Sequence, residues 1–376
     1  MKEIRAAVLH DFNAPLEIET VRLRGPEAGE VEVDIAAVAI CGSDISYLEG
    51  GFPTPLPAVF GHEAAGRVRA LGPGVRGLAV GDRVVVTLIR ACGSCPSCRN
   101  AHPAICEAPA SPERTPLALP DGTPLAQGLQ VGGFAEAVVV DQSQVVRIPD
   151  FVPMPSAALL ACGVITGVGS AVNVARIRPG EAVAVIGAGG VGLNAIQGAR
   201  IAGARRIVAI DTSSEKLDAA RAFGASDGVS AREAKPWSAA KALNGGRGFD
   251  VVLVAVGSAP AYEAAPRYLA PGGRMVMVGL PHASENARYS PLGMAYAGQS
   301  ILGSMMGDAV IGRDIPWLIE MYRQGRLQLD ELVSATWPLD EINAALAATR
   351  EGRGRRNVVV IGDAPGSGVV PAAKAR

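Results

Sequence analysis

The chain has 376 residues, of which 49% are hydrophobic and 19% are charged. A chain of this length and composition is expected to form two or three domains around a sizeable core, which excludes bulk disorder. Thirty-five basic residues against 36 acidic ones leave a formal net charge of −1, and this balance argues against a nucleic-acid-binding surface.

The sequence also bears on the compartment. Every apolar run of about 18 residues is interrupted by a charge, a glycine or a proline, so no membrane span is predicted. The N-terminal residues 1–5 carry charges without an apolar stretch behind them, so no signal peptide is expected. We therefore expect a cytoplasmic protein whose thiols stay reduced.

Residues 1 to about 150 have the pattern of a β-rich domain. Val31, Val33 and Ile35 alternate with charged or small neighbours, which is the period of a half-buried strand. Short strands are also predicted at 81–87 and 135–140, and glycine and proline interrupt the segments between them. The pattern favours a compact antiparallel or barrel-like domain.

From about residue 153 the pattern changes to a long Ala-rich helix at 156–174, followed by alternating strands and helices. Strands are predicted at 181–186, 206–210, 250–256 and 274–278, and helices at 190–202, 214–223 and 259–268. Such alternation is typical of a parallel sheet covered by helices. The run Pro271-Gly272-Gly273 is predicted to close a helix.

The last 70 or so residues contain an amphipathic stretch at 315–322 and a final strand at 357–361. This segment is a candidate to return to the first domain. The tail at 362–376 is rich in Gly, Pro and Ala, and we expect it to be frayed.

A glycine-rich turn, Gly-Ala-Gly-Gly-Val-Gly at 187–192, stands between a predicted strand and a predicted helix. Gly187 permits the tight turn, Gly189 allows close approach of a pyrophosphate, and Gly192 allows close helix–strand packing. Asp211 ends the next strand, where it can accept hydrogen bonds from ribose hydroxyls and repel a 2′-phosphate. This combination predicts a dinucleotide site that favours NAD over NADP; the alternative is a glycine-rich turn of an ordinary α/β domain.

Four of the six cysteines crowd into a short segment, at Cys92, Cys95, Cys98 and Cys106. Four thiolates on one loop suit a closed tetrahedral zinc site, which is structural because no coordination position stays open. His102 lies in the same lobe and could replace one sulfur. A nucleic-acid-binding zinc ribbon is the competing use, although the lobe has no basic cluster.

The other two cysteines suggest a second metal site. Cys41, His62 and Cys162 would make a three-ligand zinc site with an open fourth position. Each residue also has an ordinary interpretation, because buried cysteines are common and a histidine beside glycine often serves in a turn. Sequence spacing does not bring Cys162 to Cys41, so the residues alone leave both interpretations open.

Taken together, these motifs resemble those of the zinc-dependent medium-chain dehydrogenases over about residues 1–361. Within that family they are most similar to the alcohol dehydrogenase branch that uses a Cys-His-Cys catalytic zinc, which is liver-type or class III-like. The resemblance implies an α/β protein in which 1–163 and 306–376 form a GroES-like β-barrel catalytic domain, and 164–305 a Rossmann domain with a doubly wound parallel sheet that binds NAD. The structural zinc lobe would span about 90–107, and the active site would lie in the cleft between the domains.

By this resemblance Cys41, His62 and Cys162 hold the catalytic zinc, and the four-cysteine lobe holds a structural zinc. Ser43 would pass on the alcohol proton, Asp44 would orient His62, and Glu63 would stand behind the zinc. The implied cofactor-binding residues are Gly187, Gly189, Gly190, Val191, Gly192, Asp211, Lys216 and Arg356.

Two positions depart from the family pattern. Gly42 stands where many relatives carry a cationic residue against the pyrophosphate, and Ser46 stands where some relatives end the proton relay with histidine. The implied substrate pocket is apolar, although each of its members is equally well an ordinary core residue. It comprises Ser43 together with Leu56, Leu88, Phe134, Leu280 and Met306.

The leading hypothesis is an NAD-dependent zinc alcohol dehydrogenase, with two zinc ions per chain, that interconverts a primary or secondary alcohol with an aldehyde or ketone. One alternative is a formaldehyde dehydrogenase that acts on a thiol adduct, and another is a non-catalytic NAD-responsive zinc protein. A small-molecule substrate, no nucleic-acid or membrane partner, and a homodimer or homotetramer joined near the apolar stretch 300–305 are expected.

Overall fold

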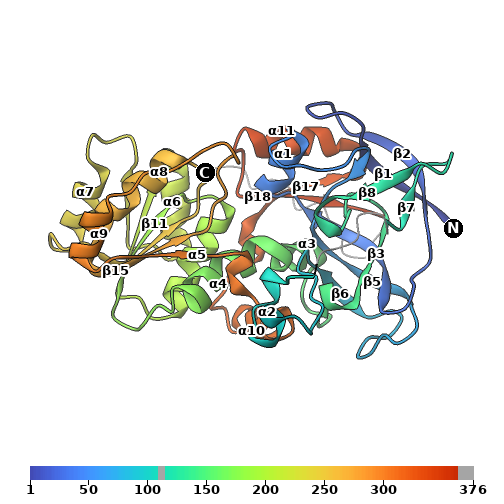
Figure 1. The fold of residues 1–376 in the computed structure, drawn as a ribbon, viewed down its shortest axis with the longest axis horizontal. Helices are drawn as coiled ribbons and strands as arrows, with labels where there is room; N and C mark the ends of the chain where they lie inside the picture. Colours follow the sequence, from blue (N-terminus) through green and yellow to red (C-terminus); the bar gives the residue numbers. More distant parts are fainter. Residues whose placement is uncertain (109–114, 363–376) are drawn as a thin grey trace. The chain divides into compact units, whose positions relative to one another are not determined.

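A computed structural model describes residues 1–108 and 115–362 of the chain (Figure 1). These residues form two compact units: one contains the described residues of Met1–Cys162 and Val310–Arg376, and the other is Gly163–Ala309. The sequence placed the corresponding boundaries after residues 163 and 305. The tail expected to be frayed lies outside the described residues, apart from its first residue, Gly362.

The first unit is built from two β-sheets. A closed barrel runs in the order β1-β2-β7-β8-β4, and a seven-stranded sheet runs β10-β6-β5-β3-β18-β17, with β9 also paired to β3. The barrel strands are β1 (Lys2–Leu9), β2 (Glu17–Leu23), β4 (Ala58–Val59), β7 (Leu117–Ala118) and β8 (Pro124–Gln127). The other strands are β3 (Glu30–Ala39), β5 (Glu63–Leu71), β6 (Arg83–Val86), β9 (Ala137–Asp141), β10 (Val145–Arg147), β17 (Val333–Pro338) and β18 (Arg356–Val360).

The long strand β3 forms the centre of this unit. Its apolar residues Val31, Val33 and Ile35 are buried, as their alternation predicts, and β5, β9 and β18 all pair with it. Glu32 is buried between them, and its carboxylate is neutralised by ion pairs with Lys2 and Arg69. Strand β3 ends at Ala39, two residues before Cys41, so the centre of the sheet positions that cysteine.

The C-terminal segment returns to this first unit. Strand β18 pairs antiparallel with β3 and parallel with β17, which places residues from the two ends of the chain side by side (Figure 1). The amphipathic stretch lies in helix α10 (Ile311–Arg323), and α11 (Ile342–Arg350) packs on β18. Short helices α1 (Gly42–Leu48), α2 (Pro96–Arg99) and α3 (Met154–Leu159) complete the unit.

The second unit contains a six-stranded, wholly parallel sheet in the order β13-β12-β11-β14-β15-β16. In chain order this is 3-2-1-4-5-6, the arrangement of a dinucleotide-binding sheet, and it confirms the expected fold class. The strands are β11 (Ala182–Ile186), β12 (Arg206–Asp211), β13 (Asp227–Ser230), β14 (Phe249–Val254), β15 (Leu269–Met277) and β16 (Ser300–Gly303). Their helices are α4 (Ile165–Gly169), α5 (Gly190–Ile201), α6 (Ser214–Ala222), α7 (Pro236–Leu243), α8 (Ala259–Ala264) and α9 (Pro291–Ala297).

Some elements of this unit escaped the sequence patterns. Strand β13 reads Asp-Gly-Val-Ser, so it has too few apolar residues to show a strand period. Strand β16 is equally short, but it lies within the apolar stretch 300–305 that the sequence had singled out. The expectation that Pro271-Gly272-Gly273 closes a helix is wrong. The run lies inside β15, where Pro271 and Gly272 are exposed and Gly272 has a φ of +72°. The helix predicted to reach Tyr268 ends at Ala264 and tightens into a 3₁₀ turn.

The long Ala-rich helix expected at 156–174 is present and spans Met154–Val174. Its 21 residues are long and apolar enough to cross a membrane by length and composition alone, because the helix continues through the glycines that interrupt the apolar run. Some 83% of the most apolar 18-residue stretch of this helix is buried inside the structure, as in a core helix. Two stretches of π-helix, at Leu160–Val164 and Ser170–Val174, interrupt the regular geometry, and the first of them contains Cys162.

Candidate metal centre and cofactor site

A buried cluster of metal-ligating groups lies in the first unit. Cys41 caps the N-terminus of α1, His62 and Glu63 stand at the start of β5, and Cys162 comes from the π-helical turn. One ligand atom from each of the four residues lies within 4.8 Å of the others, and all four residues are buried. The fold therefore brings together the three residues that sequence spacing alone could not connect.

Asp44 fixes the orientation of His62. Its carboxylate lies 3.0 Å from Nδ1 of His62 and accepts hydrogen bonds from the main-chain N–H groups of Cys41, at 2.9 Å, and Gly61, at 3.2 Å. With Nδ1 engaged, Nε2 is the ring nitrogen that remains free to bind a metal. A carboxylate hydrogen-bonded to the other ring nitrogen commonly orients a metal-binding histidine in this way. Asp44 is fully buried, so these three partners account for its charge.

Glu63 pairs with Arg356 of β18 in the interior beside the cluster. Desolvation of the carboxyl raises the pKa of Glu63 to about 7, against the opposing charge of Arg356. The family resemblance implied a place behind the zinc for Glu63 and a phosphate contact for Arg356, without linking the two. The structure buries Arg356, 6% exposed, against Glu63, and this pairing has no signal in the sequence because the two residues are almost 300 positions apart.

The donor set fits a zinc ion. Nε2 of His62 is buried and has no hydrogen-bond partner among the described residues, which is costly for a polar atom unless a ligand satisfies it. A hydrogen bond with Cys162 lowers the pKa of Cys41, while the same contact raises that of Cys162, so the pair favours one thiolate even before a metal is bound. Two sulfurs and one imidazole are a ligand set that binds zinc and leaves a fourth position open.

Two serines follow Cys41 on helix α1. Ser43 Oγ lies 3.7 Å from Cys41 Sγ, so its hydroxyl borders the cluster. Ser46 Oγ donates to the main-chain oxygen of Gly42 at 3.2 Å and is therefore turned onto its own helix. Of the two hydroxyls, the one on Ser43 is placed to meet a ligand of the cluster.

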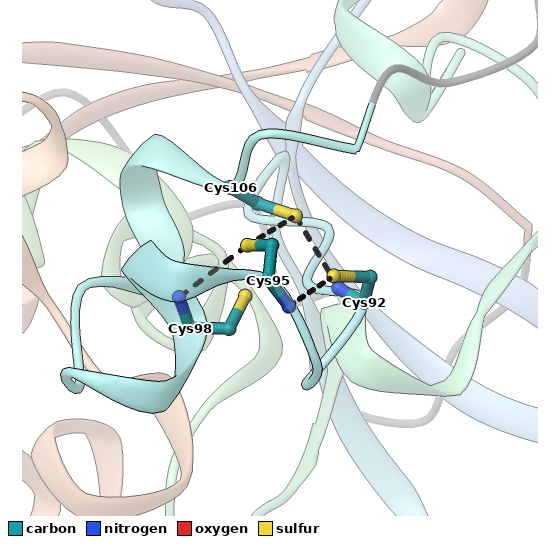
Figure 2. Close-up of side chains that lie close together, drawn as sticks. All are labelled: Cys92, Cys95, Cys98 and Cys106. Carbon is teal, nitrogen blue, oxygen red and sulfur yellow. Dashed lines mark hydrogen bonds between the residues drawn. The ribbon is translucent and has the colours of Figure 1, made fainter.

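The second cluster consists of the four lobe cysteines, Cys92, Cys95, Cys98 and Cys106, whose sulfurs converge on one point (Figure 2). Main-chain N–H groups of the same loop donate to these sulfurs: Cys92 to Cys106 at 3.4 Å, Cys95 to Cys92 at 3.3 Å, and Cys98 to Cys95 at 3.5 Å. Such donors favour the thiolate, and those from Ser94 and Cys95 lower the pKa of Cys92 to about 6. All six cysteines of the chain are free, which leaves both clusters available for metal.

The described residues contain a third such group, His10, Glu17 and Glu19, which the sequence analysis did not single out. Glu17 and Glu19 lie two residues apart on β2, so they share a face, and Nε2 of His10 lies 2.5 Å from Glu19. The hydrogen bond to Glu19 raises the pKa of His10 and accounts for the grouping as an ion pair.

The glycine-rich turn in the second unit has the geometry of a phosphate-binding loop. Gly187 has a φ of +92°, which favours glycine, and a Cβ on Gly192 would lie 1.8 Å from the main-chain oxygen of Gly187. A Cβ on Gly189 would meet nothing within 4 Å, so the space above the N-terminus of α5 is open to a ligand. Gly190 and Val191 begin α5, whose free N–H groups and positive dipole end suit a phosphate.

Asp211 closes β12 and is tied to this turn. Its Oδ2 accepts a hydrogen bond from the N–H of Ala188 at 2.8 Å, and its Oδ1 accepts one from the N–H of Ser213 at 3.0 Å. Each oxygen keeps a lone pair for a ribose hydroxyl. Lys216 is half-buried in the first turn of α6, where its N–H donates to the capping Ser213.

The residues expected to line a substrate pocket are placed in different environments. Leu56 and Leu88 are partly buried against the barrel core, whereas Phe134 is completely buried within it. In the second unit Leu280 is 61% exposed, and Met306 is buried with its sulfur 3.6 Å from the Thr166 hydroxyl. For Phe134 the placement favours the core alternative, since a fully buried ring presents no surface to a ligand.

Comparison with known proteins agrees with this arrangement. Residues 27–150 match the family model described as the alcohol dehydrogenase GroES-like domain, and residues 190–324 match the one described as zinc-binding dehydrogenase. The chain is 34% identical to putative alcohol dehydrogenase D of Mycobacterium tuberculosis, over 94% of this chain and 99% of that protein. It is 32% identical to the NDMA-dependent alcohol dehydrogenase of Amycolatopsis methanolica, over 95% and 98% of the two chains.

Among solved structures, benzyl alcohol dehydrogenase from Acinetobacter calcoaceticus superimposes with a TM-score of 0.91 at 30% identity, covering 96% of this chain and all of the other. These relatives span almost the whole length of the chain. The GroES-like and Rossmann-type domains expected from the sequence are therefore confirmed. The chain belongs to the zinc-binding medium-chain alcohol dehydrogenase family.

Proposed function

We propose that this oxidoreductase is an NAD-dependent zinc alcohol dehydrogenase, which reversibly transfers hydride between a primary or secondary alcohol and NAD. The observation that carries the proposal is the buried convergence of Cys41, His62 and Cys162 around an unsatisfied imidazole nitrogen. A purely structural site would be closed by a fourth protein ligand from cysteine or histidine, and none of the described residues supplies one there.

We assign the catalytic zinc to these three residues and a structural zinc to the four-cysteine lobe, giving two ions per chain. When bound by the buried cluster, zinc supplies Lewis acidity that lowers the pKa of an alcohol toward neutrality. The choice of two sulfurs and one imidazole supports the branch of the family with a Cys-His-Cys site. Glu63 is the fourth member of the cluster, but its charge is already met by Arg356.

The side chains around the cluster have separate tasks in this proposal. Asp44 holds the His62 ring through Nδ1, so that Nε2 points at the metal position. The hydroxyl of Ser43 accepts the alcohol proton and passes on its own, which a group that both donates and accepts can do. Because Ser46 is bonded to the helix backbone and a serine hydroxyl is not a base at neutral pH, we expect the proton to leave Ser43 through the cofactor ribose or water.

The cofactor assignment rests on the second unit. The open space above Gly189, the strained turn at Gly187 and the carboxylate of Asp211 at the end of β12 together match what a dinucleotide with a free ribose 2′-hydroxyl requires. Asp211 would repel a 2′-phosphate, so we propose NAD as the preferred cofactor.

The test is a panel of aliphatic and aromatic primary and secondary alcohols with NAD, following the formation of reduced nicotinamide. Benzyl alcohol belongs in the panel because a relative of solved structure carries that name. Turnover with one or more alcohols, and the reverse reaction with the matching aldehyde or ketone, supports the proposal. Formaldehyde oxidation that requires an added thiol would identify the thiol-adduct alternative, and NAD binding without any turnover would identify the non-catalytic one.

We further propose that the protein is cytoplasmic, where its thiols stay reduced, and that two copies of the chain associate there. The association would use the open edge of the parallel sheet. Strand β16 pairs only with β15 among the described residues, so one row of its backbone groups lacks a strand partner. Helix α9 nearby exposes Leu292, at 80%, and Tyr296, at 94%, and a second copy would cover both. Sedimentation analysis of the purified protein tests this, and a monomer at micromolar concentration would contradict it.

A further inference from the structure

Arg232 stands at the end of the sheet where the adenosine half of a dinucleotide would bind. Strand β13 ends at Ser230, which pairs with Asp211 at the end of β12, and Arg232 follows two residues later. Its Nε donates a hydrogen bond to the main-chain oxygen of Thr212 at 3.1 Å, and its N–H donates to Ser230 Oγ at 3.3 Å. The guanidinium is therefore held beside the residue that immediately follows Asp211.

This guanidinium has donors to spare. Arginine carries five N–H groups, and Thr212 uses the one on Nε. Within residues 1–108 and 115–362, neither Nη group of Arg232 has a recorded hydrogen bond or ion pair. The charge and four N–H groups of Arg232 are thus available to a ligand at the carboxyl end of β12.

The position matters because Asp211 alone would exclude a 2′-phosphate. Its carboxylate is anchored by the main-chain N–H groups of Ala188 and Ser213, so it cannot swing away from a negatively charged group. An arginine next to such a site provides the opposite preference, since a planar guanidinium can bind phosphate oxygens through two parallel hydrogen bonds. The Arg232 guanidinium offers such a phosphate contact, because it is bonded to Thr212, the residue that follows Asp211.

We propose that Arg232 is a specificity-determining residue that allows the dinucleotide site to accept NADP in addition to NAD. Its Nη groups bind the 2′-phosphate of NADP, whereas the 2′-hydroxyl of NAD is bound by Asp211 and makes little use of Arg232. The inference rests on the proposed nicotinamide site and deepens it, because it predicts dual cofactor use where Asp211 alone predicts strict NAD dependence.

The test is calorimetric titration of NAD and NADP into the full-length zinc-loaded protein and into Arg232→Ala, Arg232→Lys and Arg221→Ala. Loss of a charge-assisted phosphate contact in Arg232→Ala should weaken NADP binding about tenfold or more, while NAD binding changes by less than about threefold. Arg232→Lys should restore part of the NADP affinity, because it keeps the charge but not the planar fork. The matched control is Arg221, an exposed arginine paired with Asp218 at the far end of α6, whose loss should affect neither cofactor.

The outcomes separate the inference from the function beneath it. An NADP affinity that is the same in wild type and Arg232→Ala, or that falls equally in Arg221→Ala, overturns the inference while NAD binding leaves the proposed function intact. Equal losses for NAD and NADP in Arg232→Ala overturn it as well, because they indicate a general contact instead of one to the 2′-phosphate. Binding of neither dinucleotide to wild type overturns the proposed cofactor site itself.

Discussion

The two cysteine clusters of this protein position their sulfur atoms in different ways. The lobe draws its four ligands from one short loop, exposes them partly to solvent, and hydrogen-bonds their sulfurs with its own backbone. The buried cluster draws Cys41, His62 and Cys162 from three distant segments, and Asp44 of α1 orients the His62 ring. A local loop brings the four lobe cysteines together by itself, whereas the three residues of the buried cluster meet only because the fold of a whole domain positions them.

The largest expected effect is the loss of catalysis on removal of a buried ligand. Cys41→Ser should reduce turnover by about 10³-fold or more, because the Lewis acidity lost is worth several kcal/mol of transition-state stabilisation. Elemental analysis should show one zinc per chain in place of two, with NAD binding by titration unchanged. Turnover near the wild-type level would remove this cluster from the mechanism.

The lobe should respond in stability instead of chemistry. Cys95→Ala also leaves one zinc per chain, but it should lower the thermal midpoint by about 5 °C or more, because a structural zinc contributes directly to folding. NAD binding, read at a temperature where the variant is folded, serves as the control. A variant with the midpoint and zinc content of wild type would show that the lobe does not hold a metal.

The next largest effect is expected from Asp44, which orients the His62 ring. Asp44→Asn keeps the size of the side chain but removes the charge facing Nδ1 of His62, and we expect a loss of about 10- to 100-fold in zinc affinity of the buried cluster. Chelator competition measures this loss separately from activity. Asp121→Asn is the matched control, since Asp121 is an exposed carboxylate that accepts a hydrogen bond from Thr123 in its own turn. Equal zinc affinity in the two variants would contradict the role of Asp44.

The smallest effect concerns an ion pair that touches neither cluster. Glu181 and Arg274 are both 20% exposed, and the hydrogen bond between them lowers the pKa of Glu181. A lowered folded-state pKa stabilises the protein above the unfolded value of about 4.5, and this contribution is lost as pH falls through the folded value. Glu181→Gln should therefore cost about 1 kcal/mol at pH 7 and progressively less below pH 4.5, by denaturant unfolding.

The control measurement for Glu181→Gln is its zinc content. Both zinc ions should remain bound in Glu181→Gln, because the pair lies in the second unit. A stability loss that does not change with pH would mean that the effect of the substitution is steric and not electrostatic.

Local patterns predicted a large part of the fold and of the site. The glycine-rich turn, Asp211 and the four lobe cysteines were identified from spacing alone, because each depends on neighbours a few residues away or on one βαβ unit. The alternating strands and helices likewise gave the parallel sheet. Strand β13, which has little apolar content, carried no period and was missed.

What the sequence by itself determined is therefore local: the four-cysteine lobe, the glycine-rich turn and the core strands. The tertiary structure decided the contacts between distant segments, such as the meeting of Cys41 with Cys162, the burial of Arg356 against Glu63, and the placing of Arg232 beside Thr212. The physical reason is that spacing constrains only residues joined by a short stretch of backbone. Contacts across the chain depend on which sheet edges and helix faces pack together, and this is settled by burial of the core as a whole.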